Sequence, residues 1–488
     1  MNFKGVNIKI NDRKVILFGG ILLTVLYYLI FTPIYNYGDA PVYIDYARAI
    51  AEKADTSFYI HRSPLYPWVL SFFVTHFEVK KLASFVVFIQ YMMIFFSGYL
   101  FFLILKNHYE KSLIPLVSTL FYYLNFSVIF YGYMLLTEIL TLFLFILTLY
   151  LFDRALIRDS DRLLILSGVT ASFLCLGRFN ILPVVFLFPL YIILYGLLWR
   201  KGKLLRLTGK VFIFSFPLIV VLNGYALRNY LRNDFYGVFP SGGSLFVSRN
   251  ALVSTIKGNE EVSDSNRAVL QIFTKYSEEY RKNSIPVNKG SFLFKGREKI
   301  LGKIYGGYLI YMHSVPELCK HYGIDSGKPE PALSRKLVSF YSEVRKINRK
   351  EINELRFLSL FNSLRSSTGL VLNNGEELNF DKLPVFLIKF YKILMFIFSS
   401  FVFIISLIYF GLIVFKVITP VHPEILFILL FIGFIGENFL LAVVSDASRY
   451  KFPSEPIMIF LGIYFINKIV LNMKVKVKSV LPLRTELS

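Results

Sequence analysis

The chain has 488 residues, of which 55% are hydrophobic and 17% aromatic, with a mean hydropathy of +0.56 and a formal net charge of +22. A soluble protein of this size needs far more polar surface, so the composition excludes that class and indicates a polytopic membrane protein. The basic residues stand mostly in short segments between apolar runs, which indicates membrane orientation and contact with anionic lipid head groups, and no nucleic-acid binding.

Apolar runs long enough to cross a bilayer recur along the chain, since a membrane-spanning helix needs about 20 apolar residues. The first run lacks the small-residue cleavage site of a signal peptide, so we expect it to be retained as a span. The ten expected spans are Val15–Ile34, Leu82–Leu105, Leu113–Tyr131, Ile139–Phe152, Leu163–Leu176, Ile181–Trp199, Leu207–Leu227, Val385–Phe415, Glu424–Val444 and Ile457–Leu471. Pro64–Phe77 is apolar but short, and it predicts a helix lying in the membrane interface.

Ten spans put both ends of the chain on one side of the membrane, and the basic residues indicate which side. Lysine and arginine crowd the N-terminus, the C-terminal tail and alternate loops, whereas the opposite short connections are almost free of lysine. The positive-inside rule then places both termini in the cytoplasm of a multi-pass plasma (inner) membrane protein.

This topology divides the chain into three parts. Residues 1–227 form an N-terminal transmembrane block whose first outer loop is 35–81, and 385–488 form a C-terminal transmembrane block with a basic cytoplasmic tail. Residues 228–384 are the only sizeable polar segment, and their helix-like patterns predict a mostly helical extracytoplasmic subdomain. Cys175 and Cys319 are far apart in sequence and give neither a disulfide framework nor a metal-ligand spacing.

Two acidic residues fall at the predicted non-cytoplasmic face. Asp39 follows the first span and precedes an amphipathic stretch, where it could cap a helix or act as a base. Glu138 stands at the start of an otherwise apolar helix, where the helix dipole could stabilise its negative charge or where it could mark a functional site. Asp45, inside the amphipathic stretch, is a further candidate on the same face.

Arginines gather on the same face, although a basic residue there is unexpected. Arginine suits a phosphate ligand because its planar guanidinium offers paired donors, while any single one could instead be an interfacial residue. His61 could donate a proton or contact phosphate, but a lone histidine is weak evidence. The candidates are Arg62, Arg178, Arg228 and Arg449, with Tyr450 beside the last.

These residues, in this order, resemble the GT-C glycosyltransferases, in the group that contains protein O-mannosyltransferases and the lipid A aminoarabinose transferase. Asp39 follows the first span, Arg62-Ser63-Pro64-Leu65-Tyr66-Pro67 opens the second interfacial helix, and Thr137-Glu138 heads the fourth span. Arg178 lies between the fifth and sixth spans, Arg228-Asn229-Tyr230 ends the seventh, and Arg449-Tyr450-Lys451-Phe452-Pro453 precedes the last. The resemblance covers roughly the first half of the chain and its final quarter.

The resemblance implies a GT-C-like bundle of about ten transmembrane helices and a sugar transfer at the outer face. The donor would be a polyprenyl-phosphate sugar and the acceptor a hydroxyl of a lipid, glycan or protein. Asp39 would be the catalytic base, Glu138 a second acid near the sugar, and Arg62, Arg178 and Arg449 would bind the donor phosphate. The chain departs from the family at Asp39-Ala40, where many members have two acids, and at Arg62-Ser63-Pro64, where many have Lys-Pro-Pro.

Other functions stay open at this point. An O-antigen-type polymerase or ligase would depend on arginine and histidine in the large outer segment, which contains Arg281, Arg297, His313, His321 and Arg335. A flippase or transporter would carry charges midway through spans, and Glu437 is the one such charge. No metal ligands are assigned, and the residues neither require nor exclude a divalent cation.

Overall fold

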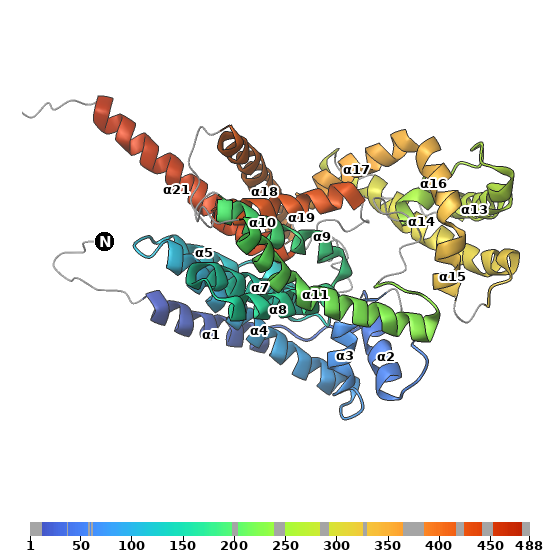
Figure 1. Cartoon of the computed structure of the whole chain (residues 1–488), viewed down its shortest axis with the longest axis horizontal. Coiled ribbons are helices and arrows are strands. Elements are labelled where there is room, and N and C mark those ends of the chain that lie inside the picture. The colour runs from blue at the N-terminus through green and yellow to red at the C-terminus, as the bar shows by residue number, and fades with distance from the viewer. Residues whose placement is uncertain are drawn as a thin grey trace, which may run out of the picture.

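The computed structural model describes residues 12–36, 38–56, 59, 62–197, 204–238, 249–283, 292–325, 329–364, 385–415, 424–441 and 452–480 (Figure 1). Across these ranges the chain is helical and contains no β-strand beyond one isolated bridge. The predicted all-α class is therefore confirmed.

Five helices of the described chain are long and apolar enough to cross a membrane, which suggests a membrane-embedded protein. They are α1 (Asp12–Ile30), α4 (Val79–His108), α7 (Glu138–Arg158), α11 (Leu204–Asn233) and the part of α18 (Val385–Val414) from Ile393 onward. A sixth crossing is added if the bent pair α5 and α6 counts as one span. The GT-C-like bundle of about ten spans stays a prediction.

Two expected spans are broken, and local chemistry explains the first break. The predicted span Leu113–Tyr131 divides into α5 (Ile114–Tyr123) and α6 (Phe126–Gly132), bent by 44°. Asn125 starts α6 as its cap, because its side chain accepts a hydrogen bond from the Ser127 N–H at 2.7 Å. The predicted span Ile181–Trp199 divides into η2 (Phe179–Ile181), α9 (Leu182–Val185) and α10 (Leu187–Tyr195).

Helix α7 lies at the centre of the bundle, packed between α4 and α8 (Asp161–Gly177). Its Phe152 ring meets the edges of Phe188 and Phe214, at centroid distances of 4.8 and 5.7 Å. Helix α8 packs closely on α11 at Gly168. A Cβ atom added there would come within 2.2 Å of the Phe214 carbonyl oxygen. Only glycine permits this approach of two backbones.

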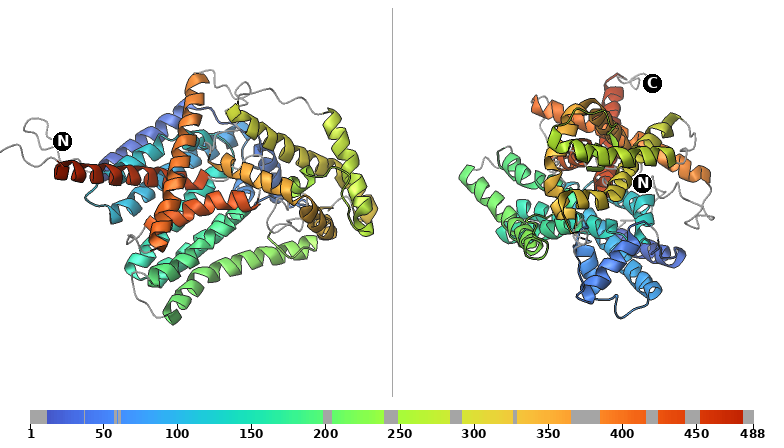
Figure 2. Two further views of the ribbon diagram at one scale, coloured as in Figure 1. Left: turned by 90° about the horizontal axis from the view of Figure 1, so that it is seen from above. Right: turned by 90° about the vertical axis from the view of Figure 1, so that its right-hand side faces the viewer.

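The C-terminal helices α19 (Glu424–Leu441), η5 (Phe452–Ser454) and α21 (Glu455–Val480) complete the bundle. In the views of Figures 1 and 2, the start of α1 and the end of α21 lie at the same end of it. Large apolar side chains on the outside of the bundle, such as Phe18, Leu205 and Phe212, are exposed. Lipid is the environment that suits such a surface.

The helices of the polar segment form a second hydrophobic core, to one side of the bundle (Figures 1 and 2). At its centre the Phe273 and Phe340 rings stack at 5.4 Å. Helix α11 continues without a break past the predicted boundary at residue 227 to Asn233. The helices are α12 (Arg249–Ser254), α13 (Asp264–Asn283), α14 (Phe292–Tyr322), α15 (Pro329–Lys336), α16 (Val338–Ile347) and α17 (Arg349–Ser363).

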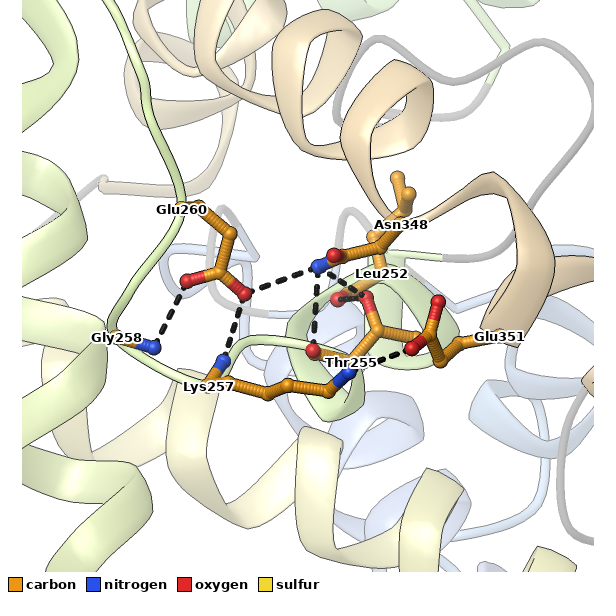
Figure 3. A network of polar contacts seen from close by, with 7 residues as sticks. All are labelled: Leu252, Thr255, Lys257, Gly258, Glu260, Asn348 and Glu351. Atoms are coloured by element: carbon orange, nitrogen blue, oxygen red, sulfur yellow. Dashed lines mark hydrogen bonds and ion pairs between the residues drawn. The ribbon is translucent and has the colours of Figure 1, made fainter.

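A polar network fastens the loop after α12 to the α16–α17 junction (Figure 3). The Glu260 carboxylate accepts hydrogen bonds from the backbone N–H groups of Lys257 and Gly258, at 2.7 and 2.8 Å. It also accepts one at 3.0 Å from the Asn348 amide, which in turn reaches the Thr255 carbonyl at 3.1 Å. Burial would raise the pKa of Glu260, but these hydrogen bonds outweigh it and hold the pKa below its ordinary value.

Candidate active site

The antiparallel helices α7 and α8 bring two of the predicted site residues together. Glu138 begins α7 and Arg178 follows the last residue of α8, so both lie at the open end of this helical hairpin. The Arg178 Nη1 and Glu138 Oε1 atoms are 3.3 Å apart, with side chains 8% and 0% exposed. An ion pair this deeply buried needs both partners, because either charge alone is costly in such surroundings.

The segment after α1 lies beside the segment before α7. Ile34 and Met134 form an isolated parallel bridge: the Ile34 N–H donates to the Tyr133 carbonyl at 2.9 Å, and the Leu135 N–H donates to the Ile34 carbonyl at 3.1 Å. This pairing anchors the segment between α1 and α2 next to the start of α7. Asp39 and Glu138, 99 positions apart in the chain (138 minus 39), thereby follow two neighbouring segments.

Asp39 precedes helix α2 (Ala40–Ala51), but its side chain makes no capping hydrogen bond. Gly38, with a φ of +61°, makes the turn into the helix. The Asp39 carboxylate instead pairs with Arg62, with 2.8 Å between Oδ1 and Nη1. Both side chains are about a quarter exposed, at 27% and 25%, so this pair is open to a substrate.

The short helix α3 (Leu65–Ser71) connects the two ion pairs. The residue after Arg62, Ser63, accepts a hydrogen bond at 3.4 Å from the backbone N–H of Phe179, the residue after Arg178. The Tyr66 hydroxyl donates to the Gln90 Oε1 at 3.1 Å, and the Gln90 amide donates to the Met134 carbonyl at 2.8 Å. Ser63 and the start of α3 are therefore tied to the α8–η2 junction and to the segment before α7.

Glu437, which joins Glu138 and Arg178 in an inner cluster, is not among the predicted site residues. The Asn180 amide donates to the Glu437 Oε1 at 2.9 Å, and the Arg178 guanidinium acts electrostatically on the same carboxylate. Gly433 lies one turn before Glu437, and a Cβ there would come within 2.4 Å of Leu187 Cδ1, so α19 lies close to α10. The sequence signal for Glu437 is an acid inside an apolar run, which by itself favours a transporter.

Two further candidates lie outside these pairs. Arg228, near the end of α11, lies over the Trp68 ring at 5.9 Å and over the Tyr225 ring at 5.7 Å. Asp45 lies one turn away from Arg48 on α2, with 3.8 Å between the charged atoms and both side chains well exposed. The structure therefore gives Arg228 an aromatic setting beside α3 and leaves Asp45 on the surface of α2.

Three predicted residues, His61, Arg449 and Tyr450, lie outside the described residues.

The site thus has an outer and an inner part. The outer part is the partly exposed pair Asp39–Arg62, and the inner part contains Glu138, Arg178 and Glu437. A carboxylate open to solvent can take a proton from a hydroxyl, and arginines can bind a phosphate through paired hydrogen bonds. The inner part has two acids for one arginine, so it also offers carboxylate oxygens as hydrogen-bond acceptors.

Within the described ranges, no group of three or more histidine, cysteine, aspartate or glutamate side chains could hold a metal ion. Comparison with models of protein families finds no match, and neither do comparisons with curated proteins and with solved structures.

Proposed function

We propose that the protein is an integral membrane glycosyltransferase that moves a sugar from a polyprenyl-phosphate donor to an acceptor hydroxyl at the non-cytoplasmic face. The observation that carries this proposal is the meeting of the Asp39–Arg62 and Glu138–Arg178 pairs, supplied by four separate segments. The hydrogen bond between Ser63 and Phe179 supports the proposal, because it joins the residues that directly follow Arg62 and Arg178. Clustered charges at one end of a bundle of apolar helices are costly and favour a function there.

A donor whose phosphate lies at membrane depth suits the two arginines. Each already pairs with a carboxylate, and a phosphate that offers several acceptor oxygens competes for the same guanidinium hydrogens. Binding at Arg62 would draw the guanidinium from Asp39 toward the phosphate. The polyprenyl chain would lie among the exposed apolar side chains of the bundle.

The transfer step uses Asp39 as a general base. The carboxylate takes the proton of the acceptor hydroxyl while the acceptor oxygen forms a bond to the anomeric carbon of the sugar. The bond between that carbon and the phosphate oxygen breaks, and polyprenyl phosphate leaves with the electron pair. Positive charge that develops on the sugar is stabilised by the carboxylate of Glu138.

The first prediction tests the base. Purified protein is incubated with radiolabelled polyprenyl-phosphate sugars, and release of polyprenyl phosphate is measured for wild type and Asp39→Asn. The amide cannot accept the proton, so we expect the rate to fall about 10²–10⁴-fold.

Asp264→Asn is the matched control, because Asp264 also pairs with an arginine at 2.8 Å but lies exposed on α13. We expect it to retain the wild-type rate. If wild type and Asp39→Asn release polyprenyl phosphate at the same rate, Asp39 is not the general base. Movement of the intact donor across a vesicle membrane without release of polyprenyl phosphate would instead indicate a flippase.

A further inference from the structure

Glu437 differs from the other buried glutamates on the C-terminal helices. Glu437 is only 3% exposed, and its Oε1 atom accepts a hydrogen bond from the Asn180 amide. The second oxygen, Oε2, is buried and has no hydrogen-bond partner in the part of the chain that the structure describes. One acceptor on a buried carboxylate is therefore left unused.

Two other glutamates on these helices use both of their oxygens. Glu455 accepts from the Asn125 amide at 2.9 Å and from the Ser127 hydroxyl at 3.2 Å. Glu424 accepts from the hydroxyls of Tyr409 and Tyr464, one on each oxygen. The bundle therefore supplies donors to both oxygens where a glutamate only joins helices.

An unused acceptor at this depth costs stability unless a ligand supplies the donor. The oxygen belongs to the same inner cluster as Arg178, which the proposed function assigns to the donor phosphate. The sugar is bonded directly to that phosphate, so its ring hydroxyls are the closest hydrogen-bond donors that the ligand can bring. Glu424 and Glu455 receive protein donors on both oxygens, whereas Glu437 receives one on Oε1 alone.

We infer that Glu437 Oε2 accepts a hydrogen bond from a ring hydroxyl of the donor sugar, which makes Glu437 a specificity-determining residue. This inference rests on the proposed function and deepens it, since it assigns the sugar end of the donor to α19. Asn180 acts as a positioning residue, because its amide holds Oε1 and leaves Oε2 unused. The preferred donor is then a sugar with a free hydroxyl at this point.

The test measures how strongly the protein distinguishes a donor from its analogues that lack one hydroxyl. The probes are the polyprenyl-phosphate sugar that wild type uses and its monodeoxyfluoro analogues, which cannot donate a hydrogen bond at the replaced position. We expect wild type to prefer the parent sugar by about 10- to 100-fold in kcat/KM over one analogue, the usual value of a hydrogen bond to a charged group. Glu437→Leu should reduce that ratio to about one, and Glu437→Gln should reduce it in part.

Binding of sugar-free polyprenyl phosphate supplies a second readout. Glu437→Gln and Glu437→Leu should bind this lipid as wild type does, because Oε2 contacts only the sugar. Glu437→Gln should also keep the melting temperature of the ligand-free protein, since the glutamine amide oxygen can still accept the hydrogen bond from Asn180. Glu455→Gln is the matched control: it should lower the melting temperature and leave the hydroxyl preference unchanged.

Each other result overturns the inference in a recognisable way. If wild type transfers sugar and the hydroxyl preference is the same in Glu437→Leu, the inference is wrong and the proposed function stands. Weakened binding of sugar-free polyprenyl phosphate would show that Glu437 only positions Arg178. If no polyprenyl-phosphate sugar is consumed by wild type, the proposed function and the inference both fail.

Discussion

Glu138 and Arg178 show what a buried charge demands of its neighbours. Neither side chain is more than 8% exposed, so the attraction between them must offset the loss of water around both. Such a pair adds little net stability compared with an apolar pair, but removal of one partner is expensive. The pair is therefore better explained by the chemistry of the site than by the stability of the fold.

This argument gives a prediction at the level of residues. Arg178→Met leaves the Glu138 carboxylate without its guanidinium, and we expect the free energy of unfolding to fall by about 3–5 kcal/mol. The double variant Glu138→Gln/Arg178→Met should recover much of this loss but remain inactive. Thermal unfolding in detergent, compared across wild type, Glu138→Gln, Arg178→Met and the double variant, measures the coupling. A single variant as stable as wild type would contradict a charged pair at this position.

Close contact between helices determines where the site residues lie. Helix α8 must hold Arg178 against the start of α7, and its other side packs on α11 at Gly168. Helix α19 holds Glu437 against the α8–η2 junction by packing at Gly433. Small residues at helix contacts are the usual means by which membrane helices approach closely.

Glycine substitutions test this packing at the level of elements. Gly168→Ala would place a methyl group within 2.2 Å of the Phe214 carbonyl oxygen, so α8 and α11 must separate. We expect a loss of about 1–3 kcal/mol, from strain in a closely packed contact. Gly224→Ala on α11 meets no atom within 4 Å and should instead stabilise by up to about 1 kcal/mol. Melting temperatures that shift in the same direction for both variants would contradict the packing argument.

At the scale of the whole molecule, the described residues form two hydrophobic cores, one in the bundle and one among α12–α17. Their surfaces differ, because helices of the bundle leave large apolar side chains such as Leu205 exposed, whereas α13 and α14 carry a surface ion pair, Lys275–Glu317, at 2.9 Å. The second core is held in part by the Glu260 network (Figure 3). Acid should therefore affect the two parts of the molecule differently.

The lowered pKa of Glu260 predicts that acid destabilises the α12–α17 region. Its pKa is lowered in the folded protein, so the ionised carboxylate stabilises the folded state at pH values above the ordinary pKa of about 4.5. This stabilisation is lost as the pH falls through the lowered pKa. We expect limited proteolysis to cut the α12–α17 region faster at pH 3–4 than at pH 7. Glu260→Gln should be cut faster than wild type at pH 7 and should differ less from it in acid. An equal difference between the two proteins at both pH values would contradict this role.

Much of the architecture follows from local features of the sequence. The length of an apolar run and the spacing of charges around it depend only on neighbouring residues, so the helical class and most long helices were predictable. The acids and arginines at one end of the bundle were predictable for the same reason, since a charge beside an apolar run is rare and conspicuous. The breaks at Asn125 and after Ile181 were missed, because composition alone does not show a bend.

Tertiary structure alone decided which of these residues meet. The sequence left two roles open for Asp39, capping of α2 and chemistry, and the approach of Arg62 gave its side chain another partner. It also left Glu437 as an isolated charge, until the packing of α19 on α10 brought it to Asn180 and Arg178. Hydrophobicity and charge are properties of each segment and can be predicted locally. The contacts that join five distant segments into one site depend on how helices pack, and the free energy of that packing belongs to the whole chain.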